Sequence, residues 1–369
     1  MPADWRAVRA EFPALQRWTH LNSATFGQLP RCAVDAAARH FAHRDELACS
    51  DFLGWFDDVD RVRGTVAELI GCAAEDVGFV TNASAGLAIF LNGIEWRKGD
   101  RAVTLAGEFP NNLYGTAALE RFGVEAVETT WERIAEFMDE RTRAVILSTV
   151  NYTTGFRPPV EKIAGTLRER GIPLYLDGTQ SVGALRVDLA AMQPAMLCVD
   201  GYKWLLSPNG AGFIYVPKEV RQWLRPNAVG WRSDRRWRNV GELHRGAPVP
   251  PEGAERYEAG MLPFALLFAM EASIKTMLEI GVEQIERRVL ALAEAARAIL
   301  RAAGGEVEDQ GTQIVAARFP GREVGAIAAR LRERRVLVAA RHGYLRVSPH
   351  FYNDEEDLER MKAALRDVL

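Results

Sequence analysis

The sequence predicts an α/β protein with a large domain, in which a mostly parallel, seven-stranded sheet lies between helices, and a smaller C-terminal α/β domain. Three observations support this prediction. Short apolar runs alternate with amphipathic helical patterns from about residue 60 to 216, which is typical of a parallel sheet covered on both faces. A long helical stretch follows at about 262–303, and a second set of short β-like and helical runs comes after it. The 369 residues are enough for one large or two moderate domains.

Seven runs of apolar and β-branched residues are the expected strands. Helical patterns such as SAGLAIFLNGI (84–94) and VEKIAGTLRER (160–170) lie between them. The last run follows the turn-rich SPNG. The expected strands are VGFVT (77–81), RAVTLA (101–106), VEAVETT (124–130), RAVILSTV (143–150), IPLYLD (172–177), AMLCVD (195–200) and GAGFIYVP (210–217).

Residues 218–260 are irregular and rich in Arg, Trp, Pro and Gly. They are too varied for a flexible linker, so we expect either a loop over a site or an ordinary solvated loop. The border between the two domains is expected between 235 and 285. We expect an N-terminal arm at 1–20, a large cofactor-binding domain at 21–260, and a small domain at 261–369 that is joined by the long helix.

Composition narrows the class of protein. Hydrophobic residues make up 48% of the chain and charged residues 26%, as in ordinary globular proteins. The net charge of −3 argues against a dominant nucleic-acid surface, and the start of the sequence lacks the apolar core of a secretory signal. Charges at i, i+4 spacing interrupt the most apolar helical stretch, so no membrane span is expected. The four cysteines lack CxxC spacing and the histidines form no metal set, so we expect a cytoplasmic protein without a metal site.

One lysine is unusual because this chain prefers arginine. Of the 46 Lys and Arg residues only six are lysines, and Lys203 lies between Tyr202 and Trp204 directly after an expected strand. An amine can lose its proton and attack a carbonyl, which a guanidinium cannot do. The strand LYLD ends at Asp177, and the carboxyl ends of parallel strands are where ligands gather. Asp177 and Lys203 therefore either flank one pocket or form a structural ion pair.

A third element indicates a phosphate site. In FVTNASAG (79–86) a strand runs into a helix whose first turn is rich in small residues, so a phosphate can approach the backbone amides, and Ser84 adds a hydroxyl. Helix capping by Asn82 or Ser84 explains the same residues equally well. The glycine motifs GxGxxG and GxxxxGKS/T of nucleotide sites are absent from the sequence. A phosphate site, an amine and a carboxylate together suit pyridoxal 5′-phosphate, which needs a lysine for its Schiff base and an acid beside its pyridine nitrogen.

These residues resemble the aminotransferase class V family of fold-type-I pyridoxal-phosphate enzymes, which includes cysteine desulfurases and isopenicillin N epimerase-like proteins. The resemblance runs from LNSATFGQLP (21–30) to LRVSPHFYNDEED (345–357). Its most specific parts are LDGTQSVG (176–183) and GYKWLLSPNGAGF (201–213) at the right separation. It implies fold type I, pyridoxal 5′-phosphate as the cofactor, and a homodimer with the active site near the subunit interface.

The resemblance also implies a role for individual residues. Lys203 matches the Schiff-base lysine and the base at the substrate Cα, and Asp177 matches the partner of the pyridine nitrogen. Arg346 matches the arginine that holds the substrate's α-carboxylate, and Arg341 is the competing candidate. The other implied cofactor contacts are Ala83 and Ser84 (phosphate turn), Phe109 (ring stacking), Asn151, Gln180 (phenolic oxygen), Tyr202 (a hydroxyl for the phosphate) and Gly260 (a backbone amide), and Asn22 and Asn151 are implied substrate contacts.

Two positions depart from the family pattern. Asp200 stands where many relatives have Ser or Thr to bind phosphate, so a carboxylate would face a dianion there. We expect this side chain to point elsewhere or to contact a donor. Met261, in YEAGMLP (257–263), replaces the usual hydroxyl residue of the segment that reaches a neighbouring subunit's phosphate, which leaves backbone donors such as the Gly260 amide.

The expected function is that of a pyridoxal-phosphate enzyme acting on an α-amino acid, by lyase (β-elimination, C–S cleavage) or epimerase chemistry, with transamination as the alternative. A ligand-sensing module would need a DNA-binding domain, and only about twenty residues precede LNSATFG. A nucleotide-dependent α/β enzyme would need its glycine motif. Persulfide-forming desulfuration is not expected, because it requires a mobile loop cysteine and no cysteine follows Cys198.

Overall fold

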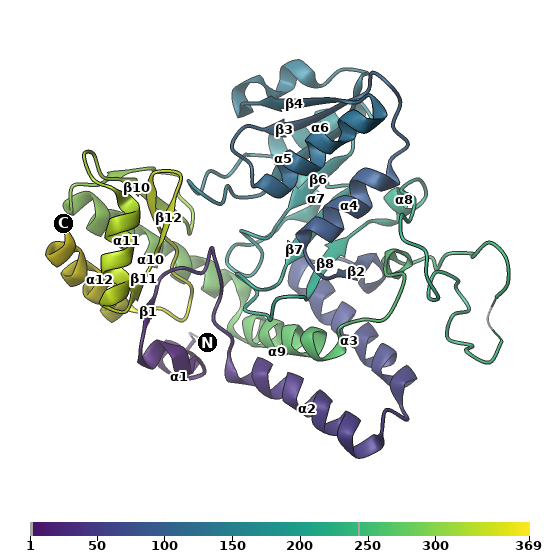
Figure 1. Cartoon of the computed structure of the whole chain (residues 1–369), viewed down its shortest axis with the longest axis horizontal. Coiled ribbons are helices and arrows are strands. Elements are labelled where there is room, and N and C mark those ends of the chain that lie inside the picture. Colours follow the sequence, from purple (N-terminus) through teal and green to yellow (C-terminus); the bar gives the residue numbers. More distant parts are fainter. Residues whose placement is uncertain (1–2, 243) are drawn as a thin grey trace.

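A seven-stranded sheet forms the centre of the larger part of the molecule (Figure 1), which confirms the expected α/β fold. The structure is a computed structural model and describes residues 3–242 and 244–369. The strands follow the order β2-β8-β7-β6-β5-β3-β4. Neighbouring strands are parallel, except that β8 runs antiparallel to β2 and β7. The strands are β2 (Val77–Val80), β3 (Arg101–Leu105), β4 (Glu125–Thr129), β5 (Thr142–Ser148), β6 (Leu174–Asp177), β7 (Met196–Asp200) and β8 (Gly212–Tyr215).

Apolar side chains alternate between the two faces of this sheet, and both faces are buried except along the edge strand β4. Along β5, Ala144 and Ile146 belong to one core cluster, whereas Val145 and Leu147 belong to the other. Helix α4 contributes to the first cluster, and helices α3 and α9 contribute to the second. The helices of this part are α2 (Arg31–Leu47), α3 (Phe52–Ile70), α4 (Ala83–Gly93), α5 (Pro110–Ala117), α6 (Glu161–Glu169), α7 (Leu189–Met192), α8 (Lys218–Arg221) and α9 (Phe264–Ile280).

The helical stretch expected at 262–303 consists of two helices and not of one. Helix α9 ends at Ile280, and α10 (Val282–Ala302) begins two residues later. Gly281 separates them with a φ of 91°, a conformation that residues with a Cβ rarely adopt. Helix α9 packs against α2 and α3 of the larger part, whereas α10 packs against β9, β10 and α12 of the smaller part. The break at Gly281 therefore marks the passage of the chain from one part to the other.

The smaller part contains a four-stranded antiparallel sheet with the order β12-β13-β10-β9. The N-terminal segment belongs to it as well, because β1 (Thr19–His20) pairs in parallel with β11 and Asn22 bridges Ser348. Figure 1 shows this segment beside the smaller part before the chain enters α2. The remaining elements are α1 (Trp5–Ala10), β9 (Glu306–Val307), β10 (Val315–Arg318), α11 (Val324–Glu333), β11 (Val336–Leu337), β12 (Ala339–Arg341), β13 (Tyr344–Val347) and α12 (Glu355–Val368).

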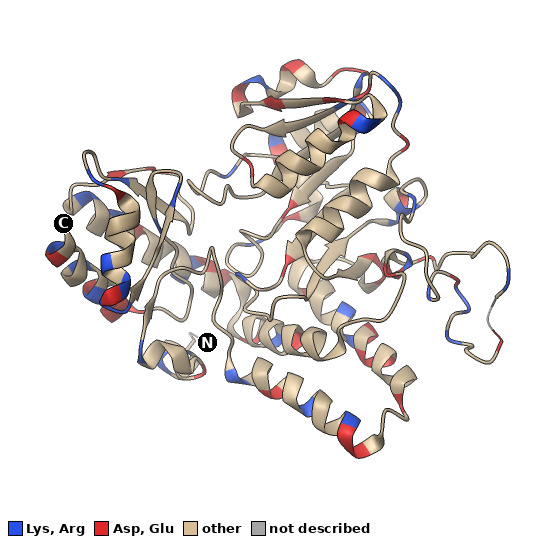
Figure 2. Ribbon diagram, viewed as in Figure 1, with Lys and Arg blue, Asp and Glu red and all other residues tan. Residues whose placement is uncertain are grey.

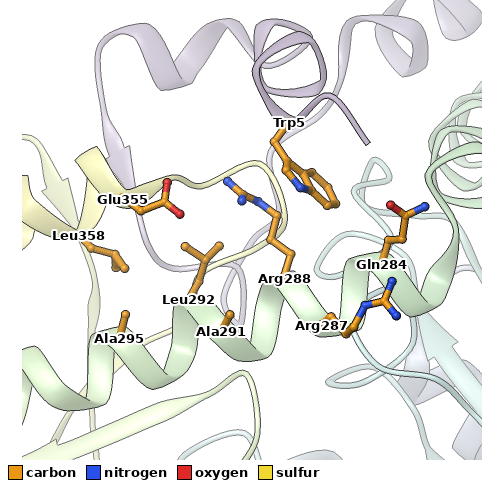
Figure 3. A pocket seen from close by; sticks show the side chains of 9 residues that line it. All are labelled: Trp5, Gln284, Arg287, Arg288, Ala291, Leu292, Ala295, Glu355 and Leu358. Carbon is orange, nitrogen blue, oxygen red and sulfur yellow. The ribbon is translucent and has the colours of Figure 1, made fainter. Parts of the chain in front are cut away.

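An arginine of α10 anchors helix α1 on the smaller part. The Arg288 guanidinium lies 4.7 Å from the ring centroid of Trp5 and donates to the carbonyls of Phe351 and Asn353 at 2.8 and 2.5 Å. Figure 3 shows Trp5 and Arg288 at a surface cavity of about 360 Å³ that Glu355 also lines. A cation over the face of a tryptophan stabilises such a contact by about 0.5–1 kcal/mol at an exposed site.

Residues 218–260 are anchored by a buried network, although they contain only short helical turns where the structure describes them. Glu258 accepts hydrogen bonds from Arg63 at 2.5 and 2.8 Å and from Arg232 at 3.1 Å. The Arg232 guanidinium also lies 4.5 Å from a ring centroid of Trp237. This part of the segment is therefore packed against the core and is not an ordinary solvated loop.

Charged side chains of both signs are interspersed over the molecule (Figure 2), in keeping with the small net charge. None of the helices in the described ranges is long and apolar enough to cross a membrane. Within residues 3–242 and 244–369, no group of three or more His, Cys, Asp or Glu side chains is arranged to hold a metal ion.

Candidate active site

A cavity of about 130 Å³ lies beyond the carboxyl ends of β6 and β7, next to the first turn of α4. Such strand ends are where α/β sheets place their ligands. Most of the expected cofactor contacts line this cavity, together with residues that sequence reasoning did not assign to it. The expected residues are Ala83, Ser84, Phe109, Asp177, Gln180, Tyr202 and Lys203, and the further residues are Asn111, Ser148, Tyr152, Thr179 and Asp200.

Lys203 lies in the turn after β7 with 7% of its surface exposed. Its Nζ lies 5.4 Å from the ring centroids of both Phe109 and Tyr202. Among the described residues the amine has no ion-pair partner, which argues against a structural ion pair with Asp177. Burial lowers the pKa of Lys203 to about 8, although Asp177 raises it, and Arg346 lowers it further. An amine with this pKa is partly deprotonated near neutral pH, as a nucleophile requires.

Asp177 ends β6 and is buried. Its Oδ1 accepts a hydrogen bond from the Thr179 amide at 2.9 Å, which holds the carboxylate at the strand end. Thr179 Oγ1 accepts in turn from the Asp200 amide at 3.1 Å, so the ends of β6 and β7 are tied together. Within the described chain Asp177 has no ion-pair partner, so its carboxylate is available to hold the proton of a ring nitrogen.

The first turn of α4 closes one end of the cavity. The helix approaches β7 closely because Gly86 has no side chain, and a Cβ there would lie 2.3 Å from Cys198 Sγ. The Asn82 side chain caps the helix by accepting a hydrogen bond from the Ala85 amide at 2.9 Å. The Ser84 hydroxyl lines the cavity and has no protein partner in the described ranges. Asn82 therefore caps the helix, and the same helix end can also attract an anion.

Asp200, the last residue of β7, faces the same helix end. Its Oδ2 accepts a hydrogen bond from the Ala83 amide at 3.3 Å. Its Oδ1 is buried and has no partner among the residues that the structure describes. The side chain therefore contacts a donor, which is one of the two expected alternatives. Burial raises the pKa of Asp200 to about 6, although the Ala83 amide and Lys203 lower it.

Gln180 and Phe109 form two further walls. Gln180 donates from Nε2 to the Ala24 carbonyl at 3.1 Å and accepts at Oε1 from Trp204 Nε1 at 2.8 Å, so its amide is held in one orientation. Phe109 has 40% of its surface exposed and contacts the ring of Tyr152 edge-on, with centroids 5.1 Å apart. The Phe109 ring is thus open for stacking, and the Gln180 side chain is rigid.

Tyr152 connects the cavity to the smaller part, and sequence reasoning missed it. Its hydroxyl forms a hydrogen bond of 2.6 Å with His342 Nε2, and its carbonyl accepts from Arg346. The two bonds bring β13 and the turn before it next to a residue that lines the cavity. The one available signal was its position directly after Asn151, at the end of an expected strand.

Arg346, the arginine expected to bind the substrate carboxylate, donates to the carbonyl of Tyr152. Arg346 in β13 has 1% of its surface exposed and donates to Thr25 Oγ1 at 2.6 Å, while Thr25 in turn donates to Asn22 Oδ1 at 2.8 Å. Burial, and to a lesser degree the charge of Arg341, lowers the pKa of Arg346 to about 9. Arg341 is half-buried in β12 and donates to its neighbour's carbonyl. Arg346 has no carboxylate partner in the described chain, so a bound carboxylate would neutralise it.

Asn151 and Gly260 do not line this cavity. Asn151 donates to the Gly107 carbonyl at 2.8 Å and accepts from the Thr153 amide at 2.9 Å, so it shapes the turn after β5. It lines a neighbouring cavity of about 240 Å³. The Gly260 carbonyl accepts from Arg232 at 3.1 Å. The cofactor contacts implied for Asn151 and Gly260 stay predictions.

Known proteins resemble this chain over most of its length. The family model Aminotransferase class-V matches residues 21–361. A probable cysteine desulfurase of Methanothermobacter thermautotrophicus is 24% identical over 98% of this chain and 97% of its own. Isopenicillin N epimerase of Streptomyces clavuligerus is 26% identical over 98% of both chains. The solved structure of the cystine C–S lyase C-DES, in complex with its product cysteine persulfide, has a TM-score of 0.89 and is 22% identical over 97% of this chain and 99% of its own, which is a likeness of fold.

Proposed function

Because the chain belongs to the aminotransferase class-V family, it is a pyridoxal-phosphate-dependent enzyme, and we propose that it acts on a free α-amino acid by C–S lyase or epimerase chemistry. The observation that carries this proposal is the Lys203 amine. It is buried without an ion-pair partner in the described chain, beside Asp177 and the first turn of α4.

The lining residues fit the cofactor in chemistry and in charge. Lys203 is the amine for its aldehyde, and Asp177 is the acid for its ring nitrogen. The first turn of α4 and the Ser84 hydroxyl are donors for its phosphate. Phe109 is a flat apolar wall for its ring. When bound, the cofactor supplies a protonated pyridine ring that accepts the electron pair released at the substrate Cα.

The chain's own groups then bind the substrate and move one proton. Lys203 would take up the proton from the substrate Cα, because its amine lies in the cavity and its lowered pKa suits a base. Asp177 keeps the ring nitrogen protonated. Arg346 holds the α-carboxylate through a bidentate pair, and Asn22 supports it through Thr25. Phe109 stacks on the ring and transfers no proton.

Lyase or epimerase chemistry is favoured over transamination by relatives that carry the names cystine C–S lyase and isopenicillin N epimerase. Transamination is the second candidate, and the family name favours it. Persulfide formation on the protein is not proposed. Cys198 is buried in β7 and burial raises its pKa well above the ordinary value, which suppresses the thiolate. No cysteine follows it in the sequence.

A homodimer is part of the proposal. Large apolar side chains are exposed around the cavity, where a second copy would cover them. Phe26 lies 4.7 Å from the ring of Tyr202, and Tyr114, 73% exposed, lines a groove that shares Ser84 and Phe109 with the cavity. Light scattering after size exclusion should give twice the chain mass of 41.0 kDa, and a monomer mass at micromolar concentration would remove this part of the proposal.

The test of the proposed function is a panel of free amino acids with the loaded enzyme. Cysteine, cystine, thioether conjugates and simple amino acids are each scored for pyruvate and ammonia, for keto-acid production, and for exchange of the Cα proton with deuterated water. Pyruvate identifies elimination, and racemised substrate without pyruvate identifies epimerisation. Amino transfer to an added keto acid without either product would replace the proposal by transamination.

A further inference from the structure

The carboxylate of Asp200 lies next to the first turn of α4, where the proposed function requires a phosphate to bind. Its Oδ2 accepts from the Ala83 amide at 3.3 Å, its Oδ1 is buried without a partner in the described chain, and the residue is one of those that line the same cavity. A phosphate ester carries close to two negative charges at neutral pH. An ionised Asp200 beside the first turn of α4 would therefore put like charges at contact distance in a buried site.

The strand that carries Asp200 is held in place. The Asp200 amide donates to Thr179 Oγ1 at 3.1 Å, and the residue pairs with Gly212 of β8. The two strands are packed closely at this point, because a Cβ on Gly212 would lie 2.6 Å from the Val199 carbonyl oxygen. Close-packed strands of this kind do not shift to separate two charges.

The charged groups around the cavity do not balance an added dianion. The titratable groups that line the described cavity with Asp200 are Lys203, Asp177, Tyr152 and Tyr202. In the proposed function Lys203 is joined to the cofactor's carbonyl carbon, so its charge is not free for the phosphate. Arg346 acts on Lys203 from the side of β13 and does not line the cavity. A proton on Asp200 removes the repulsion, and it converts an acceptor into a donor.

We propose that Asp200 takes up one proton from solution when the phosphate binds, and then donates a hydrogen bond from its unpartnered Oδ1 to a phosphate oxygen. The proton comes from solvent, and no bond of the cofactor breaks. Burial prepares this step, because it raises the pKa of Asp200 to about 6 before any anion is present. The step rests on the placement of the phosphate at α4 in the proposed function.

The test uses pyridoxine 5′-phosphate, which cannot form an imine, and the cofactor-free full-length protein. Between pH 6.5 and 8 the wild-type affinity should fall about 20-fold, because each binding event must bring a proton to a carboxylate that is increasingly ionised. Asp200→Asn and Asp200→Ser, which donate without a titrating acid, should bind with an affinity that changes no more than about twofold over this range, which is the change that titration of the Lys203 amine can cause. Asp188→Asn is the matched control, since Asp188 caps α7 outside the cavity, and it should keep the wild-type slope. Equal slopes for wild type and both Asp200 variants would overturn the proposal.

If the Asp200 variants do not fold, two measurements on the wild type still test the proposed proton uptake. Calorimetry at pH 7.5 in buffers of different ionisation enthalpy should show uptake of about one proton per ligand. The ³¹P shift of the complex should be that of a dianion, which places this proton on the protein. No uptake, or a monoanion shift, would contradict the role of Asp200. If pyridoxine binds as tightly as pyridoxine 5′-phosphate at pH 6.5, the phosphate does not bind at α4, and the placement in the proposed function fails as well.

Discussion

Replacing Arg346 by methionine should make the cofactor-free protein more stable while it removes tight binding of the substrate. The Arg346 side chain is almost fully buried, and among the described residues it has no carboxylate partner. Its hydrogen bonds go to the Thr25 hydroxyl and the Tyr152 carbonyl. A buried charge that is neutralised only by a bound ligand destabilises the fold when that ligand is absent.

The size of this effect follows from the pKa of Arg346. A pKa lowered from 12.5 to about 9 corresponds to a cost on the order of 5 kcal/mol for the charged form, mostly from burial and partly from the charge of Arg341. The folded-state pKa of this base is depressed, so the cost is fully present below pH 9 and disappears as the pH rises toward 12.5. Methionine would leave the Tyr152 carbonyl without its donor, which costs about 1–3 kcal/mol. The net expected gain in the free energy of unfolding at pH 7 is about 2 kcal/mol or more.

The same substitution should weaken amino-acid binding. Loss of a bidentate, charge-assisted pair in a desolvated site costs about 2–5 kcal/mol, which is a loss in affinity of about 30-fold to several thousand-fold. Arg346→Lys should restore only part of it, because an ammonium cannot present the planar pair of donors. Decarboxylated amines should bind wild type and variant equally, since they lack the carboxylate that Arg346 is proposed to hold.

Urea unfolding of the cofactor-free protein measures the first effect, and titration of the loaded protein with amino acid, followed by cofactor absorbance, measures the second. Arg297→Met is the matched control: Arg297 is equally buried but pairs with Glu294 at 3.0 Å and donates to the Thr312 carbonyl. Its loss should lower the stability by about 1–3 kcal/mol. A destabilised Arg346→Met that still binds amino acids with wild-type affinity would refute the reasoning. If only Arg341→Ala weakens binding, the carboxylate role moves to Arg341.

Four further outcomes are expected. Lys203→Ala should lose turnover and the visible absorbance of the lysine-linked cofactor while its circular dichroism stays native, and wild-type turnover in this variant would disprove the role of the amine. Asp177→Asn should keep bound cofactor but lose most activity, because an unprotonated ring accepts electrons poorly; unchanged kinetics would remove that role. At saturating cofactor, the rate of covalent cofactor loading should rise about tenfold per pH unit below pH 8 and level off above it, because the pKa of Lys203 lies at about 8, and a saturated rate independent of pH from 6 to 8 would contradict this. Incubation with cysteine should leave no cysteine-bound persulfide on the protein, and mass spectrometry detecting one would show that Cys198 or another thiol is reactive.

The sequence was sufficient to predict the strands and the family, because fully buried strands and strand-end motifs are local signals. The apolar pattern of β8 did not indicate that this strand is antiparallel, since apolar runs look alike in both directions. The short connection from Asp200 to Gly212 was a usable hint, because parallel neighbours need a longer crossover. The break at Gly281 was masked by continuous helical periodicity on both sides, and a lone glycine inside such a pattern is only a weak signal.

The part of the candidate site that lies at the strand ends of the large sheet could be predicted from the sequence. Lys203, Asp177 and the turn at Ala83 lie on strand ends of a single sheet, so their convergence follows from the topology. Contacts between the two parts could not be predicted in this way. The bond between Tyr152 and His342 joins residues 190 positions apart, and no periodicity in the sequence encodes it. The carboxylate of Asp200 was recognised as a departure, but its contact with the Ala83 amide needed coordinates.

The pairing of β1 with β11 has a consequence for how the protein is made. Thr19 and His20 are synthesised more than 300 residues before their partners Val336 and Leu337, whereas every strand of the large sheet lies between them. During translation the large sheet, with Lys203 in the turn after β7, can fold while β1 still lacks its partner. Only when β11 and β13 have left the ribosome do Asn22 and Arg346 come together. A nascent chain should therefore become able to hold the cofactor before it becomes able to hold an amino acid.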